Sequence, residues 1–414
     1  MVHPLRPMMT FKYKLYKSHK FGYLEALLPI ACDIYNWVLL TKREAYSWDK
    51  TNISLYEMQK MVKDRRNESN SAWKMIGSQA VEQIIDRIYN GYERFFGDLK
   101  RGVKTSPPKL KKTPKYRSIT FRQGRGYKLL DNNIIYISGQ GWKGRGGKTF
   151  RFHKHRDWRG QIKTLTIKKN NLGEWFIYIT TDYEGKLPEP TRTGKSVGLD
   201  FGLKTFLTTS DGQMIQSPQF FKQGLREIKR LSKLLNSKKK GSNNWERARL
   251  NLARAHESIT NKRKDFHWKL AVKLCQQYEF ICLEILNLKG MKALWGRKVS
   301  DLGFYQFVQI LKWEAQKHGC RVIQIDRWYP SSKECGACWH INQSLSLRDR
   351  EWNCVACNAH HDRDLNAAQN ILRVGLATLA GADVRPLKPL RKQGKKAFGV
   401  DNTRSKRHKS LRIN

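Results

Sequence analysis

The first half of the chain predicts short strands on either side of a helical region. Residues 11–17 (FKYKLYK) alternate apolar and basic side chains, which is typical of a strand with one face in solvent. From Tyr23 to about Phe96, apolar residues recur at three- and four-residue spacing, as on the buried face of amphipathic helices. A Pro- and Lys-rich segment at 101–115 follows, and then five strand-like runs extend to residue 181. This half of the chain is therefore predicted to contain a strand, then helices, then several further strands.

Strands and helices alternate along the second half. Residues 196–212 (SVGLDFGLKTFLTTSDG) predict a buried strand, a tight turn and a second strand. Further strands are predicted at 278–286 and 320–328, with helices at about 218–278, 302–318 and 364–379. Such alternation is typical of an α/β domain, so the whole chain is predicted to be an α+β multidomain protein. From Arg385 on, 11 of the last 30 residues are Lys or Arg, which predicts a disordered basic tail over 385–414.

The net charge of the chain indicates that its binding partner is a polyanion. The 80 Lys and Arg against 35 Asp and Glu leave a formal charge of +45, so the chain repels itself unless a polyanion is near. Aromatic residues are interleaved with the basic ones, which suits nucleic acid because bases stack on aromatics while phosphates pair with cations. No continuous apolar run approaches the ~18 residues of a membrane span, and the N-terminus lacks the apolar stretch of a signal peptide. We therefore expect a cytoplasmic nucleic-acid-binding protein without a membrane partner.

Four of the eight cysteines have the spacing of a zinc site. Cys335 and Cys338 form one Cys-x-x-Cys pair, and after 15 residues Cys354 and Cys357 form a second. Each pair offers two thiolates on one tight turn, and four thiolates without an open position make a structural zinc site. The 15 residues between the pairs predict the two short strands of a zinc ribbon. A redox dithiol, or two chance pairs, is the alternative interpretation.

The remaining cysteines and the nearby histidines are interpreted differently. Four scattered cysteines are expected to be small buried apolar residues: Cys32, Cys275, Cys282 and Cys320. Three histidines close to the zinc pairs are expected to contact nucleic acid or solvent rather than the metal: His340, His360 and His361.

Three acidic residues occupy positions where a carboxylate is costly. Asp200 lies inside the apolar strand VGLDFGL, and Glu284 lies inside FICLEIL. Asp364 begins the helix DLNAAQNI, where its carboxylate either caps the helix or projects toward a metal. Two-metal nucleases bring distant carboxylates together around two Mg²⁺ ions, so this set predicts such a site. Asp362 is the rival of Asp364, and spacing alone does not separate the two.

These segments resemble one known family. VGLDFGLKTF, FICLEILNLKGM, the cysteine segment YPSSKECGAC…CVAC and HDRDLNAAQNIL look like the split RuvC motifs and embedded zinc ribbon of the TnpB family. These proteins are transposon-encoded RNA-guided nucleases related to compact type V CRISPR effectors. The early strand, YNWVLLTKREAY, PPKLKK, and GQIKTLTI with WFIYI resemble the family's N-terminal half, so the resemblance covers nearly the whole chain. One departure is Ile285, where the family often has an aspartate after the glutamate.

The resemblance implies a fold and its domains. A wedge-like β-barrel is expected over 1–20 and 101–190, and a helical recognition insertion over 21–100. An RNase H-like (RuvC) α/β nuclease domain is expected over 191–330 and 360–384, and the zinc ribbon is expected over 331–359. Asp200, Glu284 and Asp364 would bind two catalytic Mg²⁺ ions, and Asp364 is preferred over Asp362 because the family aspartate precedes x-Asn-Ala-Ala.

The implied partners are a guide RNA and a target double-stranded DNA, bound by a monomer in the bacterial or archaeal cytoplasm, in association with the nucleoid. In that scheme base pairing selects the target, while the protein recognises backbone shape and a short flanking DNA motif. Basic and aromatic residues of the N-terminal half are the candidate nucleic-acid contacts: Lys12, Lys14, Tyr16, Lys17, Arg65, Arg66, Trp73, Lys74 and Arg117. Some of them are expected to be only part of a solvated basic face.

The leading hypothesis is an RNA-guided DNA endonuclease that cuts both strands with a single RuvC site. The alternatives that remain are a compact type V CRISPR effector, a non-cleaving guided DNA-binding protein or transposition regulator, and a guide-free transposase or resolvase.

Overall fold

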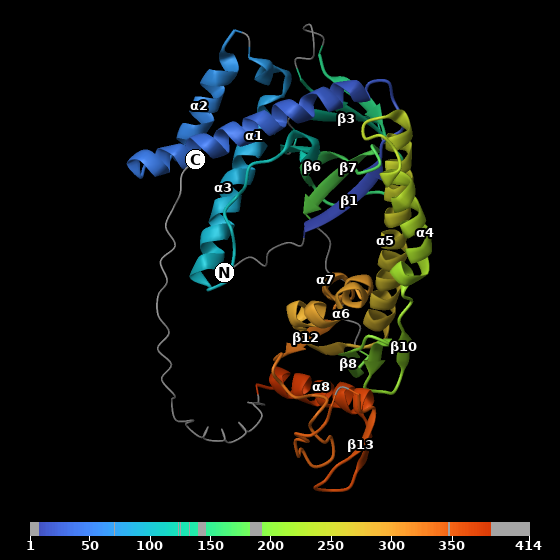
Figure 1. The fold of residues 1–414 in the computed structure, drawn as a ribbon. Helices are drawn as coiled ribbons and strands as arrows, with labels where there is room; N and C mark the ends of the chain where they lie inside the picture. Colours follow the sequence, from blue (N-terminus) through green and yellow to red (C-terminus); the bar gives the residue numbers. More distant parts are fainter. Residues whose placement is uncertain are drawn as a thin grey trace, which may run out of the picture. The chain divides into compact units, whose positions relative to one another are not determined.

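The computed structural model describes residues 8–381, except residues 70, 123, 125, 132, 140–145, 183–192 and 347 (Figure 1). The expected basic tail at 385–414 lies outside the described residues. The chain divides into two compact units, Met1–Leu187 with Phe220–Lys262, and Pro188–Gln219 with Arg263–Asn414.

The strands of the first unit form two antiparallel sheets. The four-stranded sheet has the order β1 (Met8–Lys14), β7 (Trp175–Asp182), β6 (Ile162–Lys169) and β2 (Ser118–Arg122). The three-stranded sheet has the order β3 (Tyr127–Asp131), β4 (Ile134–Ile137) and β5 (Lys148–Arg151). A bridge between Leu15 and Phe152 connects the end of β1 to the end of β5. The described strands thus form open sheets and not the expected closed barrel, because no described ladder pairs β2 with β3.

Three helices form where the helical pattern of 21–100 predicted helix. They are α1 (Phe21–Asp49), α2 (Leu55–Asn67) and α3 (Ser78–Lys100). Helices α1 and α3 pack against β2, while α2 packs against α3. The 3₁₀ helix η1 (Ala72–Met75) separates α2 from α3, and η2 (Thr113–Lys115) precedes β2. Ser54 and Glu57 form a capping box that begins α2, which satisfies backbone N–H groups at the helix start. The apolar faces of the helices and sheets share one hydrophobic core.

Helix α1 is long and apolar enough to cross a membrane by length and composition alone. Half of its most apolar window is buried inside the protein, and residues such as Leu24, Ile34 and Val38 belong to the shared core. The apolar character of α1 is therefore explained by packing against neighbouring elements of the first unit.

Two basic helices follow the first hairpin of the second half of the chain. They are α4 (Phe220–Asn236) and α5 (Asn243–Gln277). The contacts assign Phe220–Lys262 to the first unit, so α5 begins in one unit and ends in the other. The sequence pattern did not suggest this division, since 191–330 was expected to be one piece of a nuclease domain.

A mixed five-stranded sheet forms the centre of the second unit. Its order is β10 (Met214–Gln216), β9 (Thr205–Thr209), β8 (Ser196–Phe201), β11 (Phe280–Glu284) and β12 (Arg321–Ile325). Strands β8, β11 and β12 run parallel, whereas β9 and β10 are antiparallel to their neighbours. Three helices accompany the sheet: α6 (Leu288–Leu302), α7 (Phe304–His318) and α8 (Arg363–Leu379).

Helix α8 lies directly against the sheet because two glycines allow close approach (Figure 1). A Cβ atom at Gly198 of β8 would lie 2.0 Å from the carbonyl oxygen of Ala368. A Cβ atom at Gly375 would lie 2.4 Å from the sulfur of Cys282 on β11. The start of α8 is thereby fixed beside the carboxyl end of β8.

The cysteine segment folds around its two Cys-x-x-Cys turns. The short strands β13 (Glu351–Asn353) and β14 (His360–Asp362) pair across the second turn, and a bridge between Glu334 and Ile341 spans the first. The expectation of two strands between the pairs is thus only half correct. The reason is that each turn folds the chain back on itself, so each pairing flanks its own turn.

Candidate functional site

Two carboxylates lie side by side at the carboxyl edge of the second unit's sheet. Leu199 of β8 pairs with Leu283 of β11 in parallel register. Asp200 and Glu284 are the residues that follow, so the two strands bring them to the same edge, one strand spacing of about 4.8 Å apart. Carboxyl ends of strands are the usual positions for functional side chains in α/β sheets.

Asp364, in the first turn of α8, contributes the third carboxylate. The pKa of Asp200 is raised well above its usual value by burial, then by the charges of Glu284 and Asp364. Arg363 opposes this shift. Burial also raises the pKa of Glu284. The charges of Glu284 and Asp364 both act on Asp200, so these three residues, distant in sequence, lie near one another, and a bound cation would relieve the repulsion on Asp200.

Asp362 and Asp364 have different roles in the fold. Asp362 is the N-cap of α8, and its carboxylate accepts a hydrogen bond of 2.7 Å from the backbone N–H of Leu365. Asp364 lies beyond the cap and interacts electrostatically with Asp200. The geometry therefore favours Asp364 as the member of the acidic group, and capping, one of the two roles considered for Asp364, belongs to Asp362.

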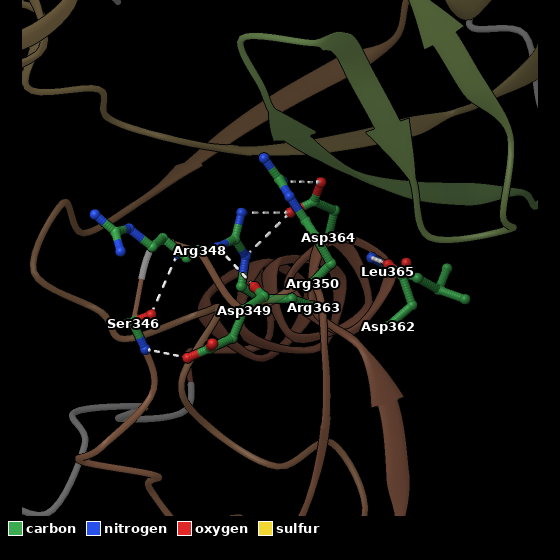
Figure 2. Close-up of polar contacts among 8 residues, drawn as sticks. All are labelled: Ser346, Arg348, Asp349, Arg350, Asp362, Arg363, Asp364 and Leu365. Carbon is green, nitrogen blue, oxygen red and sulfur yellow. Dashed lines mark hydrogen bonds and ion pairs between the residues drawn. The ribbon is translucent and has the colours of Figure 1, made fainter.

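Two arginines bind Asp364, and the sequence reasoning missed both of them. Figure 2 shows Arg350 donating from Nη1 to Oδ2 of Asp364 at 3.1 Å, and Arg363 donating to Oδ1 from Nε at 3.2 Å and from Nη2 at 3.0 Å. Arg363 also donates to the backbone oxygen of Asp349, whose carboxylate accepts from the backbone of Ser346. The sequence contains one indication of these ion pairs, since Arg350 and Arg363 lie next to acidic residues in the segments RDRE and DRDL.

The four cysteines come together as predicted. Their sulfurs all lie within 4.8 Å of one another, and among the described residues no other group of three or more acidic, His or Cys side chains meets this distance. Cys335 Sγ lies 3.7 Å from Cys357 Sγ, and Cys338 Sγ lies 3.5 Å from Cys354 Sγ. A tetrahedral zinc ion with 2.3 Å bonds requires sulfurs about 3.8 Å apart, so the cluster fits such an ion.

The histidines near the cluster differ in their surroundings. Nε2 of His361 lies 3.0 Å from Sγ of Cys335, and its ring lies against Trp352. His361 was expected at the surface or on nucleic acid, but the structure brings it into contact with a cysteine of the cluster. His360 is exposed and pairs with Asn353, while the backbone oxygen of His340 accepts from Cys335.

The other four cysteines are all buried, as expected of small apolar residues: Cys32, Cys275, Cys282 and Cys320.

The candidate nucleic-acid contacts on and after β1 are mostly exposed. Lys12 lies over the ring of Phe176 at 4.0 Å, and Lys14 forms an ion pair of 2.5 Å with Glu174. Tyr16 stacks on His153 with ring centroids 3.5 Å apart. The alternation of buried and exposed side chains along this strand ends at Leu15. Lys17 lies two residues further on and is exposed.

The candidates near α2 and η1 range from exposed Arg65 to buried Trp73. Trp73 is 4% exposed, and its indole N–H donates to Asp33 at 2.7 Å, so its side chain belongs to the core. Arg65 lies over the rings of Trp37 and Trp73, and Arg66 donates to the backbone oxygens of Trp73 and Ile76. These contacts give both arginines structural partners within the unit.

Lys74 and Arg117 are the remaining two candidates. Lys74 is half-buried on η1, and Arg117 donates to the backbone oxygen of Pro114 and contacts Asn171.

The fold has a solved counterpart. The chain matches a Cas12f1 chain from a complex with single-guide RNA and target DNA, with a TM-score of 0.59 over 88% of this chain and 98% of that one. The identity is 12%, so the similarity concerns the fold. The class defined by fold and site is therefore a compact α+β protein of Cas12f1-like architecture with a four-cysteine cluster.

Sequence comparisons specify the family more closely. Residues 176–294 match the OrfB_IS605 family, described as "Probable transposase", and residues 304–371 match the Cas12f1-like TNB domain. A "Putative RNA-guided DNA endonuclease" of Streptomyces pristinaespiralis is 26% identical over 96% of both chains. The similarly described InsQ of Escherichia coli K12 is 26% identical over 86% of this chain and 90% of its own. A TnpB-like protein of Acanthamoeba polyphaga mimivirus, L79, is 31% identical over 52% of this chain and 44% of its own. The resemblance to the TnpB family is thereby confirmed.

Proposed function

We propose that this protein is an RNA-guided DNA endonuclease of the TnpB type. The observation that supports it most is that Asp200 and Glu284 lie at one sheet edge while the charge of Asp364, on α8, acts on Asp200, in a chain whose relatives carry that description. The sheet order β10-β9-β8-β11-β12, in which β9 alone runs opposite to the other strands, is the arrangement expected of an RNase H-like (RuvC) domain.

The acidic group suits divalent cations. Carboxylate oxygens are the preferred ligands of Mg²⁺, and two such ions activate water and stabilise the leaving oxygen of a phosphodiester. Asp200 and Glu284 come from rigid neighbouring strands, so they hold their oxygens at a fixed edge. Burial raises the pKa of both carboxyl groups, and a bound cation would stabilise their charged forms.

We propose that the two arginines pair with Asp364 in the absence of cations and with DNA phosphate in their presence. Before cations bind, Arg350 and Arg363 neutralise the Asp364 carboxylate. If Asp364 held a cation instead, both guanidinium groups would lie beside the site, with Arg363 still donating to the backbone oxygen of Asp349. Guanidinium groups pair readily with phosphate, so they would orient the phosphodiester there.

The first unit would bind the guide RNA and the guide–target heteroduplex. Its exposed basic side chains, such as Lys12 and Lys17, supply sequence-independent attraction to phosphates. Base pairing would select the target, and the protein would recognise a short flanking DNA motif. A single protein chain on one RNA and a structural zinc ion at the four cysteines are parts of this proposal. So are the expected domain limits, except that Phe220–Lys262 packs with the first unit.

The test uses the protein purified together with RNA expressed from its own locus. The copurified RNA is sequenced, and the complex is incubated with a plasmid library carrying the matching target beside randomised flanking bases. We expect double-strand cuts that require Mg²⁺ and disappear in Asp200→Ala. Undiminished cutting by Asp200→Ala, or cutting that survives removal of the RNA, contradicts the proposal.

A compact type V CRISPR effector is the second candidate, favoured by the similarity of the fold to Cas12f1. The genes beside this one discriminate between the two. A CRISPR array supports the effector, whereas transposon ends with an overlapping non-coding RNA support the TnpB type.

A further inference from the structure

Two asparagine side chains are buried on one face of helix α8. Asn366 is 2% exposed and Asn370 is 1% exposed. A buried amide is costly unless each of its polar atoms has a partner, and asparagine is not a strong helix former. The packing of α8 on the sheet uses Ala368 and Gly375. It therefore explains neither the burial of the two amides nor the presence of two asparagines in the helix.

Both amides hold the first Cys-x-x-Cys turn. Asn366 donates to the backbone oxygen of Glu334 at 2.7 Å and accepts from the backbone N–H of Gly336 at 2.9 Å. It therefore binds the chain immediately before and immediately after Cys335, whose side chain is fully buried. Asn370 donates to the same Glu334 oxygen at 2.8 Å and to that of Ser331 at 2.9 Å.

The approach of Gly336 to α8 is as close as its lack of a side chain allows. A Cβ atom at Gly336 would lie 2.9 Å from Oδ1 of Asn366. The side chain of Glu334 adds a second connection to the helix, because Arg373 and Tyr329 both bond to its carboxylate. The turn that carries Cys335 and Cys338 is thus fixed to α8 by several buried polar bonds, which low surrounding polarity strengthens.

The helix so held also carries the third carboxylate of the acidic group. Asp364 precedes Asn366 by two residues, about 3 Å along the helix axis. A helix turn moves as a unit, so a shift of the cysteine turn displaces the Asp364 carboxylate. The four thiolates need a metal to remain within 4.8 Å of one another, since unbound thiolates repel.

We propose that Asn366 and Asn370 are positioning residues that couple metal loading of the four-cysteine cluster to the position of Asp364. The inference deepens the proposed function, on which it rests. Zinc at the cysteines and Mg²⁺ at the carboxylates therefore bind with positive coupling. Coupling between two sites is reciprocal, so Mg²⁺ stabilises the zinc site by the same factor by which zinc favours Mg²⁺.

Reciprocity allows a test without guide RNA or DNA. The equilibrium partition of zinc between the full-length protein and 4-(2-pyridylazo)resorcinol is measured by colour over a series of indicator concentrations, with and without saturating Mg²⁺. We expect Mg²⁺ to lower the zinc dissociation constant about fivefold in the native protein, at the lower end of usual coupling energies. In Asn366→Ala/Asn370→Ala we expect zinc to bind more weakly and independently of Mg²⁺.

Two controls separate coupling from general damage. Gln369→Ala removes an amide from the exposed face of the same helix, and it should bind zinc as the native protein does. Asp364→Ala should abolish the Mg²⁺ effect while leaving the zinc dissociation constant without Mg²⁺ close to native. This second control still tests the coupling if the double variant does not fold.

The inference is overturned if Mg²⁺ leaves the zinc dissociation constant of the native protein unchanged, or if the double variant keeps the full Mg²⁺ effect. The failure of the proposed function has another signature, since it concerns cleavage by the native complex. A protein that shows coupling but never cuts DNA contradicts the nuclease and not the coupling.

Discussion

The guanidinium of Arg350 and the carboxylate of Asp364 form an ion pair of 3.1 Å that joins the cysteine segment to the start of α8. The arginine is more than half exposed, and the aspartate is 22% exposed. An exposed pair of this kind contributes about 0.2–1 kcal/mol. It is therefore weak enough to break when a divalent cation competes for the same oxygens.

Replacing Arg350 should make the acidic group a better cation site. In Arg350→Ala, the competing positive charge is lost, so we expect the Mg²⁺ concentration for half-maximal cleavage to fall about two- to fivefold. A Mg²⁺ titration of initial cleavage rates at saturating DNA measures this. Arg348→Ala removes an exposed arginine of the same loop and should leave the midpoint unchanged. A midpoint that rises in Arg350→Ala would show that the arginine does not compete with the cation.

Replacing Asp200 should stabilise the protein while removing its activity. The folded pKa of Asp200 is raised, so its protonated form carries no penalty, and stability is lost as pH rises from 3.8 through the folded pKa. Asp200→Asn removes this loss. Without added Mg²⁺, the difference in unfolding free energy between Asp200→Asn and native should therefore grow with rising pH and then level off. Urea unfolding at several pH values measures it, and a difference that is flat with pH contradicts the assignment of a raised pKa.

Adding one methyl group at Gly198 should separate α8 from the sheet. The new Cβ of Gly198→Ala would meet the backbone oxygen of Ala368, which has no flexible side chain to move aside. We expect a loss of about 1–3 kcal/mol in unfolding free energy, typical of overpacking, together with reduced cleavage. Gly296→Ala in α6 meets nothing within 4 Å and serves as the control for thermal unfolding. Equal unfolding temperatures for the two variants would contradict the close packing described.

Among the candidate nucleic-acid contacts of the first unit, exposed Lys17 and buried Trp73 should respond differently to substitution. Lys17 is exposed, so Lys17→Ala should weaken RNA binding and reduce the slope of log affinity against log salt by about 1 if it pairs with one phosphate. Trp73→Phe loses the hydrogen bond to Asp33 in the core, so it should lower the unfolding temperature with the salt slope unchanged. Filter binding to the copurified RNA over a salt series measures both. A changed slope in Trp73→Phe would point to direct contact with RNA.

Local spacing was enough to predict several features of this protein. The two Cys-x-x-Cys pairs predicted one cluster of four sulfurs because the pairs form tight turns whose geometry is set within four residues. The apolar strands around Asp200 and Glu284 were recognisable because a carboxylate inside an apolar run is rare and costly. Helical periodicity likewise predicted the helices between 21 and 100, although their exact limits came from the structure.

Other features depended on contacts between distant residues, and no local pattern contains them. Asp362 and Asp364 are alike in sequence, and only the cap geometry of α8 separates them. Trp73 has the character of a surface aromatic in a basic segment, yet burial beside Asp33 makes it part of the core.

The same reason explains Arg350, Asn366 and Asn370. Their roles arise because the cysteine segment folds back on α8, which brings together residues that the chain separates by 14 to 39 positions. The chemistry of each residue was thus readable from the sequence. Which residues meet was decided by the tertiary structure, since packing of apolar surface and satisfaction of buried polar groups act on the whole fold at once.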